Sequence, residues 1–114
     1  MHIFLAVKKR LYTFFTLFLL VIYGGLVIFL MLHHEPWRDE ADAWLLARDN
    51  SLFGIIGLMR YAGTPCLWYL MLAPLAKVGI PYAAQFYLHT AIAITAVGIF
   101  LRFAPFPLPL KVLF

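Results

Sequence analysis

The sequence predicts an all-α integral membrane protein with about three transmembrane helices, and three observations lead to this prediction. Of its 114 residues, 65% are hydrophobic and only 12% are charged, whereas soluble domains carry about 25% charged residues. One apolar stretch is long enough to cross a bilayer, and all acidic residues lie in one loop. A soluble enzyme fold is excluded, because a small chain buries only about two-thirds of the surface that its unfolded form exposes.

The first transmembrane helix is predicted at 11–32, after a basic N-terminus at 1–10 that contains Lys8, Lys9 and Arg10. The 22 uncharged residues of this stretch would form a helix of roughly 33 Å, which spans the hydrocarbon core. A cleaved signal peptide is the alternative. Its apolar region is usually about 7–15 residues long and ends in a small-residue cleavage pattern, which this stretch lacks, so we expect an uncleaved anchor.

A second transmembrane helix is predicted at 63–79. It opens at Thr64-Pro65, a capping hydroxyl followed by a proline suited to the first helical position, and it closes at Gly79. The segment is short for a crossing, and Lys77 is expected to extend to the interface. We expect this helix to begin earlier or to lie among neighbouring helices.

A third transmembrane helix is predicted at 81–103, because prolines at 105, 107 and 109 prevent its continuation. The short connection at 79–81 requires it to run antiparallel to the second. Residues 104–114 resemble the beginning of a further apolar segment. The chain is therefore interpreted as an apparent fragment of a larger polytopic fold.

The charges predict an orientation. The basic flank at 8–10 places the N-terminus in the cytoplasm and the 33–62 loop outside. Lys77 then falls on the cytoplasmic side, in agreement, whereas Arg102 falls outside. We expect an integral protein of a bacterial inner membrane with lipid as its surroundings and no nucleic-acid partner, since the chain lacks a solvated cluster of basic residues. The acidic residues are Glu35, Asp39, Glu40, Asp42 and Asp49.

The external loop at 33–62 changes from continuous to amphipathic hydrophobicity and predicts two short interfacial helices. Asp39 is expected to cap the first, with Trp44 and Leu45 on its apolar face. Ser51 is expected to begin the second.

Two interpretations of Asp39 and Glu40 follow from residue type alone. Neighbouring carboxylates can act as general acid or base, or bind a divalent cation. Alternatively, they stabilise the N-terminus of the helix through its dipole. The spacing favours the second interpretation, because adjacent side chains on a helix diverge by about 100°.

Other polar residues admit simpler explanations. His33, His34 and Glu35 are interpreted as an interfacial edge, since adjacent ligands are poorly placed around one metal ion. Gln85 and His89 lie four residues apart on one helix face, where they would make interhelical hydrogen bonds or line a substrate path.

The order of features resembles the N-terminal part of the polytopic C-type (GT-C fold) glycosyltransferases, which include protein O-mannosyltransferases and lipid A arabinosyltransferases. The residues that carry this resemblance are the run 37–44 (WRDEADAW) after the first span and the later run 63–70 (GTPCLWYL). In that superfamily an acidic pair lies on the first external loop, followed by helices on the membrane surface. Asp39 and Glu40 occupy the corresponding positions.

The resemblance implies transfer of a sugar from a polyprenyl-phosphate donor to an acceptor hydroxyl, with inversion at the anomeric carbon. Asp39 would be the base and Glu40 its support, so both are candidate catalytic residues. Arg38, Asp42 and Arg60 are candidate substrate-binding residues. No cofactor is certain, and a divalent cation remains open. Such enzymes enclose their lipid-linked sugar with many helices, so this chain is expected to need missing transmembrane helices or a partner membrane protein.

Two other functions remain open from the sequence. One is a small, non-catalytic membrane protein for interaction or assembly, whose acidic loop contacts a basic partner. The other is a fragment of a transporter, with Gln85 and His89 on the transport path. DNA that continues the open frame with further spans would favour the transferase.

Overall fold

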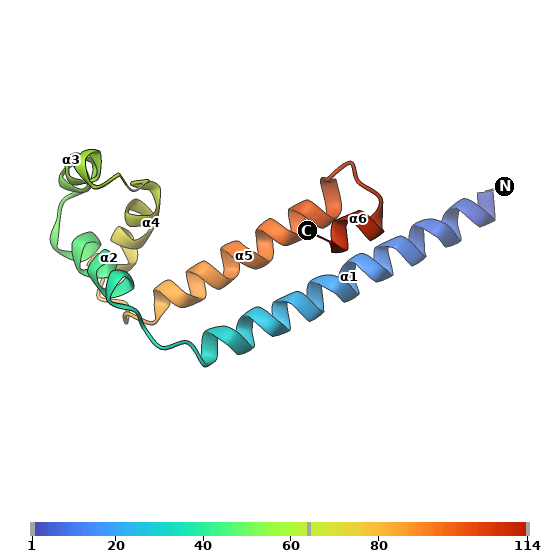
Figure 1. The fold of residues 1–114 in the computed structure, drawn as a ribbon, viewed down its shortest axis with the longest axis horizontal. Helices are drawn as coiled ribbons and strands as arrows, with labels where there is room; N and C mark the ends of the chain where they lie inside the picture. Colours follow the sequence, from blue (N-terminus) through green and yellow to red (C-terminus); the bar gives the residue numbers. More distant parts are fainter. Residues whose placement is uncertain (1, 64, 114) are drawn as a thin grey trace. The chain divides into compact units, whose positions relative to one another are not determined.

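The computed structural model describes residues 2–63 and 65–113, and the described chain is entirely helical (Figure 1). It divides into two compact units. The first unit comprises Met1–His33 and His89–Phe114, and the second comprises His34–Leu88. The six helices are α1 (His2–Leu32), α2 (Arg38–Asp49), α3 (Leu52–Ala62), α4 (Leu67–Lys77), α5 (Ala84–Phe103) and α6 (Leu108–Val112).

In the first unit, α1 and α5 run side by side in opposite directions (Figure 1). The pairing order fixes this direction: Gly24 faces Ile94, Gly98 faces Leu20, and the Tyr12 hydroxyl donates to the Leu101 carbonyl oxygen at 3.4 Å. Later residues of α1 therefore meet earlier residues of α5. Glycines at these contacts allow close approach of the two backbones.

These two helices could cross a membrane by length and composition. The apolar parts comprise Ala6–Leu32, with 27 residues, and Ala84–Phe103, with 20 residues. At 1.5 Å per residue they measure about 40 Å and about 30 Å, against a hydrocarbon core of about 30 Å. Only 6% and 17% of their most apolar windows are buried inside the structure, which contrasts with the core helix of a soluble domain.

The basic residues of the predicted N-terminal segment at 1–10 belong to the same helix as the apolar stretch. α1 begins at His2 and includes Lys8, Lys9 and Arg10. No glycine or proline occurs in this part of the chain, so nothing interrupts the helix before the apolar stretch.

The helix predicted at 81–103 begins at Ala84 and ends at Phe103, as the following prolines require. Ahead of it, Gly79 has a φ of 78° and forms the predicted end of α4. Its N–H donates to the Ala76 carbonyl oxygen, and the Ile80 N–H donates to that of Leu75. This pair of bonds is a Schellman motif, which needs a left-handed residue.

The segment predicted as the second transmembrane helix, 63–79, contains only the 11-residue helix α4. That helix is about 17 Å long, roughly half of the hydrocarbon thickness. Pro65 precedes it and Gly79 ends it, which leaves no room for extension. Thr64, the expected cap, lies outside the described residues. α4 therefore does not reach across a bilayer by itself.

α2, α3 and α4 instead form the core of the second unit. α4 packs against both α2 and α3. Trp44 and Leu45 were both predicted on the apolar face of this helix; Trp44 is 6% exposed and belongs to the core cluster, whereas Leu45 is exposed. The buried face of α2 includes Ala43 and Ala47, whose small side chains permit close packing, and it does not include the larger Leu45. The cluster consists of Ala43, Trp44, Ala47, Ile55, Met59, Leu72, Ala73 and Ala76.

Both ends of α3 carry residues that are suited to capping a helix. The Ser51 hydroxyl accepts a hydrogen bond from the Gly54 N–H at 3.1 Å, which confirms the predicted cap. Gly63 has a φ of 65° and ends the helix in the left-handed conformation, which glycine adopts without steric cost.

We predict that replacing Gly24 will show how closely α1 and α5 pack. A Cβ at Gly24 would lie 3.6 Å from Ile94 Cδ1, which is ordinary contact, so Gly24→Ala should keep the pairing. Gly24→Leu must displace Ile94 and should cost about 1–3 kcal/mol. Thermal unfolding of the full chain in detergent, followed by circular dichroism, measures the difference.

Gly25→Leu is the matched control, because nothing lies within 4 Å of a Cβ placed there. Equal melting temperatures for Gly24→Leu and Gly25→Leu would contradict the observed pairing of α1 with α5.

Candidate functional site

The candidate site lies at the N-terminus of α2, where Glu40 is the central residue. The helix begins after Trp37, whose backbone is extended. The Trp37 N–H donates to Glu40 Oε2 at 2.8 Å. A glutamate at the third helical position that accepts from the capping residue is one half of a capping box. The expectation that Asp39 caps the helix is wrong, because α2 begins at Arg38 and its cap position is Trp37, two residues before Asp39.

His34 also binds Glu40. Its Nε2 lies 2.9 Å from Oε2 and 3.0 Å from Oε1 of the carboxylate. About one third of each side chain is exposed, so the pair is partly shielded from water. The imidazole ring contacts the edge of Phe86, with 5.3 Å between ring centroids. His34 and the Trp37 backbone together fix the position of the Glu40 carboxylate.

Tyr82 and Gln85 supply buried polar groups to the same unit. Gln85 is 2% exposed, and among the described residues its Nε2 and the Tyr82 hydroxyl are buried without a hydrogen-bond partner. Burial raises the pKa of the Tyr82 phenol above its ordinary value, the negative charge of Glu40 raises it further, and the nearby Gln85 amide opposes both effects. Tyr82 therefore stays protonated near neutral pH.

Aromatic rings surround these polar groups. Tyr82 meets Trp44 of α2 edge-on, with 5.9 Å between ring centroids. It meets Phe86 in the same way at 5.4 Å. The rings link the beginning of α5 to α2 and form an apolar wall beside the hydrogen-bonding groups.

The structure separates the two predicted catalytic residues. Glu40 is partly buried and engaged, whereas Asp39 is exposed. Consecutive residues of a helix point in directions about 100° apart, so the two carboxylates do not share one face. For Glu40, the interpretation as a helix-stabilising group is confirmed by its bond to the Trp37 N–H.

The predicted substrate-binding residues are all exposed. The Arg38 Nε lies 3.8 Å from Asp42 Oδ2, with 92% and 63% of the side chains accessible. Such a pair contributes little to stability, and Arg38 remains accessible to a ligand. Arg60 lies in the last turn of α3 and is exposed.

The residues that sequence reasoning missed here are His34, Tyr82 and Gln85. His34 was interpreted as part of a polar edge, yet it faces a carboxylate six positions later. The chain turns near Pro36, and the spacing of residues in the sequence does not predict contacts across such a turn. Gln85 was expected to bond to a neighbouring helix, but its Nε2 finds no partner among the described residues.

The site offers few metal ligands. Within residues 2–63 and 65–113, no group of three or more His, Cys, Asp or Glu side chains is close enough to hold an ion. His34 and Glu40 are two potential ligands, and a structural metal site in a protein normally has at least four.

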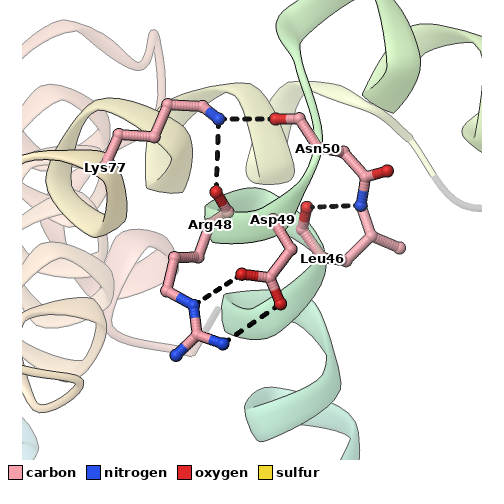
Figure 2. A network of polar contacts seen from close by, with 5 residues as sticks. All are labelled: Leu46, Arg48, Asp49, Asn50 and Lys77. Atoms are coloured by element: carbon pink, nitrogen blue, oxygen red, sulfur yellow. Dashed lines mark hydrogen bonds and ion pairs between the residues drawn. The ribbon is translucent and has the colours of Figure 1, made fainter.

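A second polar network closes the other end of α2 (Figure 2). Lys77 of α4 donates to the carbonyl oxygens of Arg48 at 3.3 Å and Asn50 at 2.6 Å. The Asn50 amide donates to the Leu46 carbonyl oxygen at 3.0 Å. These bonds satisfy carbonyl groups that the helix leaves open at its end, and they attach α4 to α2. Lys77 was expected at the cytoplasmic interface, whereas it holds the loop helices together.

Arg48 and Asp49 form a two-pronged ion pair beside this network (Figure 2), with Nε–Oδ1 at 2.7 Å and Nη2–Oδ2 at 3.1 Å. The hydrogen bond from Arg48 holds the pKa of Asp49 below its ordinary value. The pKa of Arg48 is raised in turn. Any stabilisation from Asp49 is present above the pKa that it has in the unfolded chain. It is lost as pH falls through the lower pKa of the folded state.

A comparison of the chain with protein-family models finds no matching family, and searches of curated proteins and of solved structures find no match either.

We predict that Glu40→Ala will destabilise the second unit by about 1–2 kcal/mol, because the Trp37 N–H and His34 lose their acceptor. Glu40→Gln should cost less, since an amide oxygen can still accept from Trp37. Urea denaturation of the full chain in detergent, followed by tryptophan fluorescence, reports on the buried Trp44.

Asp39→Ala is the matched control for this effect. It removes a neighbouring exposed acid and weakens only the dipole interaction, at about 0.3–1 kcal/mol. A loss for Asp39→Ala as large as that for Glu40→Ala would show that the Glu40 contacts do not matter.

Proposed function

We propose that this chain is the N-terminal, membrane-bound part of a glycosyltransferase that moves a sugar from a polyprenyl-phosphate donor to an acceptor hydroxyl. The observation that carries the proposal is the division of roles in the acidic pair. Glu40 is fixed by Trp37 and His34, while the adjacent Asp39 is exposed. An immobile carboxylate thus anchors the helical turn that presents an accessible one.

The chemistry assigns one step to Asp39. Its carboxylate accepts the proton of the acceptor hydroxyl while that oxygen attacks the anomeric carbon. The bond from this carbon to the phosphate oxygen breaks on the opposite face, and the polyprenyl phosphate leaves with the electron pair. General-base catalysis by a positioned carboxylate contributes about 10²–10⁴-fold to such a rate.

Glu40 is a positioning residue in this proposal. Its oxygens already accept from the Trp37 N–H and lie within bonding distance of His34, so they are not available to an acceptor hydroxyl. Holding a reacting group in one geometry is itself a large part of catalysis.

Arg38 is the residue best suited to contact the donor phosphate. It neighbours Asp39, and its long contact with Asp42 is weak enough to be exchanged for a ligand. Guanidinium groups bind phosphate oxygens through charge-assisted hydrogen bonds. Arg60 would supply a second positive charge, and Asp42 would orient Arg38 before the substrate arrives.

We also propose a topology with two crossings, by α1 and α5, rather than three. Because these helices are antiparallel, the two chain ends then share one side and residues 33–83 face the other. Lys8, Lys9, Arg10 and Arg102 fall together, and every acid lies on the opposite side. This arrangement follows the positive-inside rule for both helices, whereas three crossings leave Arg102 outside.

The Asp39→Asn variant tests the proposed chemistry. In membranes of the organism that carries the gene, with the native copy replaced, transfer of labelled sugar from polyprenyl phosphate should fall by about 10²-fold or more. Glu40→Gln should lower the rate by less, because the amide still accepts from Trp37.

Asp49→Asn is the matched control, since Asp49 is an exposed acid at the far end of the same helix. Transfer at the normal rate in Asp39→Asn membranes would refute the assignment of Asp39. It would favour the non-catalytic assembly role, for which the Glu40 contacts alone suffice.

Cysteine labelling tests the topology in the full chain. In a Cys66→Ser background, single cysteines replace Tyr61, Val78 or Leu113, which are 93%, 72% and 81% exposed. A membrane-impermeant maleimide should label positions 61 and 78 in intact cells and position 113 only after lysis. If position 78 is not labelled in intact cells, the result favours a third membrane crossing by α4. If position 61 is not labelled, the loop does not face outward and the proposed function is overturned.

A further inference from the structure

Lys111 is a buried cation in the first unit. It belongs to α6 and is 5% exposed. Its Nζ donates to the Leu101 carbonyl oxygen at 2.7 Å and to the Tyr12 hydroxyl at 2.9 Å. The ammonium group also lies 5.7 Å from the centroid of the Tyr12 ring. These partners are all uncharged, and two hydrogen bonds leave the third N–H of the ammonium for another acceptor.

No carboxylate side chain is available to balance this charge within the first unit. The five acidic residues of the sequence all lie between 35 and 49, in the second unit. The first unit holds five basic residues instead: Lys8, Lys9, Arg10, Arg102 and Lys111. A buried ammonium without an anion is costly, and inside a membrane protein such a residue normally marks a functional contact.

An apolar groove opens beside Lys111. It has a volume of about 520 Å³ and lies between α1, α5 and α6. Its walls include Ile22 and Leu26 of α1 and Ala96 and Phe100 of α5, while Lys111 lines it from α6. This volume falls in the range of about 300–1,000 Å³ that is typical of small-molecule sites. Tyr23 adds one phenol to the lining. A groove with one cation, one phenol and otherwise apolar walls suits an amphiphile with one negative group.

We propose that this groove binds an anionic phospholipid, with an acyl chain along the apolar walls and the phosphate at the Lys111 ammonium. The positive charge of Lys111 is complementary to that headgroup, and the apolar walls of the groove suit an acyl chain. Basic pockets between membrane helices bind such headgroups, and anionic lipids attract nearby lysines and arginines. The inference requires membrane insertion but not sugar transfer.

Lipid-dependent stability tests this site. The full chain is purified in neutral detergent, and its melting temperature is measured with added phosphatidylglycerol or phosphatidylcholine of equal chain length. A ligand that binds only the folded state raises this temperature. We expect a concentration-dependent rise with phosphatidylglycerol at lipid levels at least tenfold below those needed for phosphatidylcholine.

Three variants locate the effect. Lys111→Met should abolish the preference for phosphatidylglycerol. Ala96→Phe should do so as well, because it fills the groove and leaves every charge in place. If Lys111→Met fails to fold, Ala96→Phe still tests whether lipid binds in the groove. Lys8→Met removes an exposed cation outside the groove and should keep the preference.

Equal effects of the two lipids on the native chain would overturn the proposal, as would an unchanged preference in Ala96→Phe. A comparable rise with inorganic phosphate alone would also overturn it, since it would indicate an anion site without a lipid chain. Sugar transfer at the normal rate in Asp39→Asn membranes would refute the proposed function but would leave this lipid measurement unaffected, so the two proposals fail separately.

Discussion

The exclusion of charge from the apolar helices is the constraint on which the rest of the structure depends. α1 and α5 carry their charged residues only near the ends that lie away from the loop, at 8–10 and at 102. Two of the polar side chains between are bonded within their own helix: the hydroxyls of Thr16 and Thr95 donate to carbonyl oxygens four residues earlier. In lipid, where no water can replace such bonds, this local pairing avoids the cost of unsatisfied groups. All five acidic residues therefore lie in the second unit, together with Arg38, Arg48, Arg60 and Lys77.

Within that loop, the same physical contacts explain a structural role and support the catalytic role that we propose. A carboxylate at the third position of a helix is favoured by the dipole and by a free N–H group, so Glu40 is a stabilising residue in any function. Fixing Glu40 also fixes the first turn of α2, and with it the exposed side chains of Arg38 and Asp39. The two interpretations of the acidic pair are therefore compatible, since the stabilising one applies to Glu40 and the catalytic one is proposed for Asp39.

The parts of the fold that depend on local rules could be predicted from the sequence. The C-terminal end of α5, the Ser51 cap and the turn at Gly79 follow from residue type at one or two positions. The length of α4 could not be predicted from hydrophobicity, because Leu72 is equally suited to a protein core and to lipid, and here it is buried against neighbouring helices. Contacts such as that of His34 with Glu40 depend on how the chain folds back at Pro36, which spacing does not specify.

Lys77 and Lys111 show why counting basic residues gives an incomplete topology. Each donates to carbonyl oxygens at the C-terminal end of a helix, Lys77 at the end of α2 and Lys111 at Leu101 in the last turn of α5. A cation is stabilised there by the helix dipole and by open carbonyl groups. Their positions thus report where a helix ends rather than which side of a membrane they occupy. With Lys77 assigned to the loop helices, the remaining charges of α1 and α5 agree on one orientation.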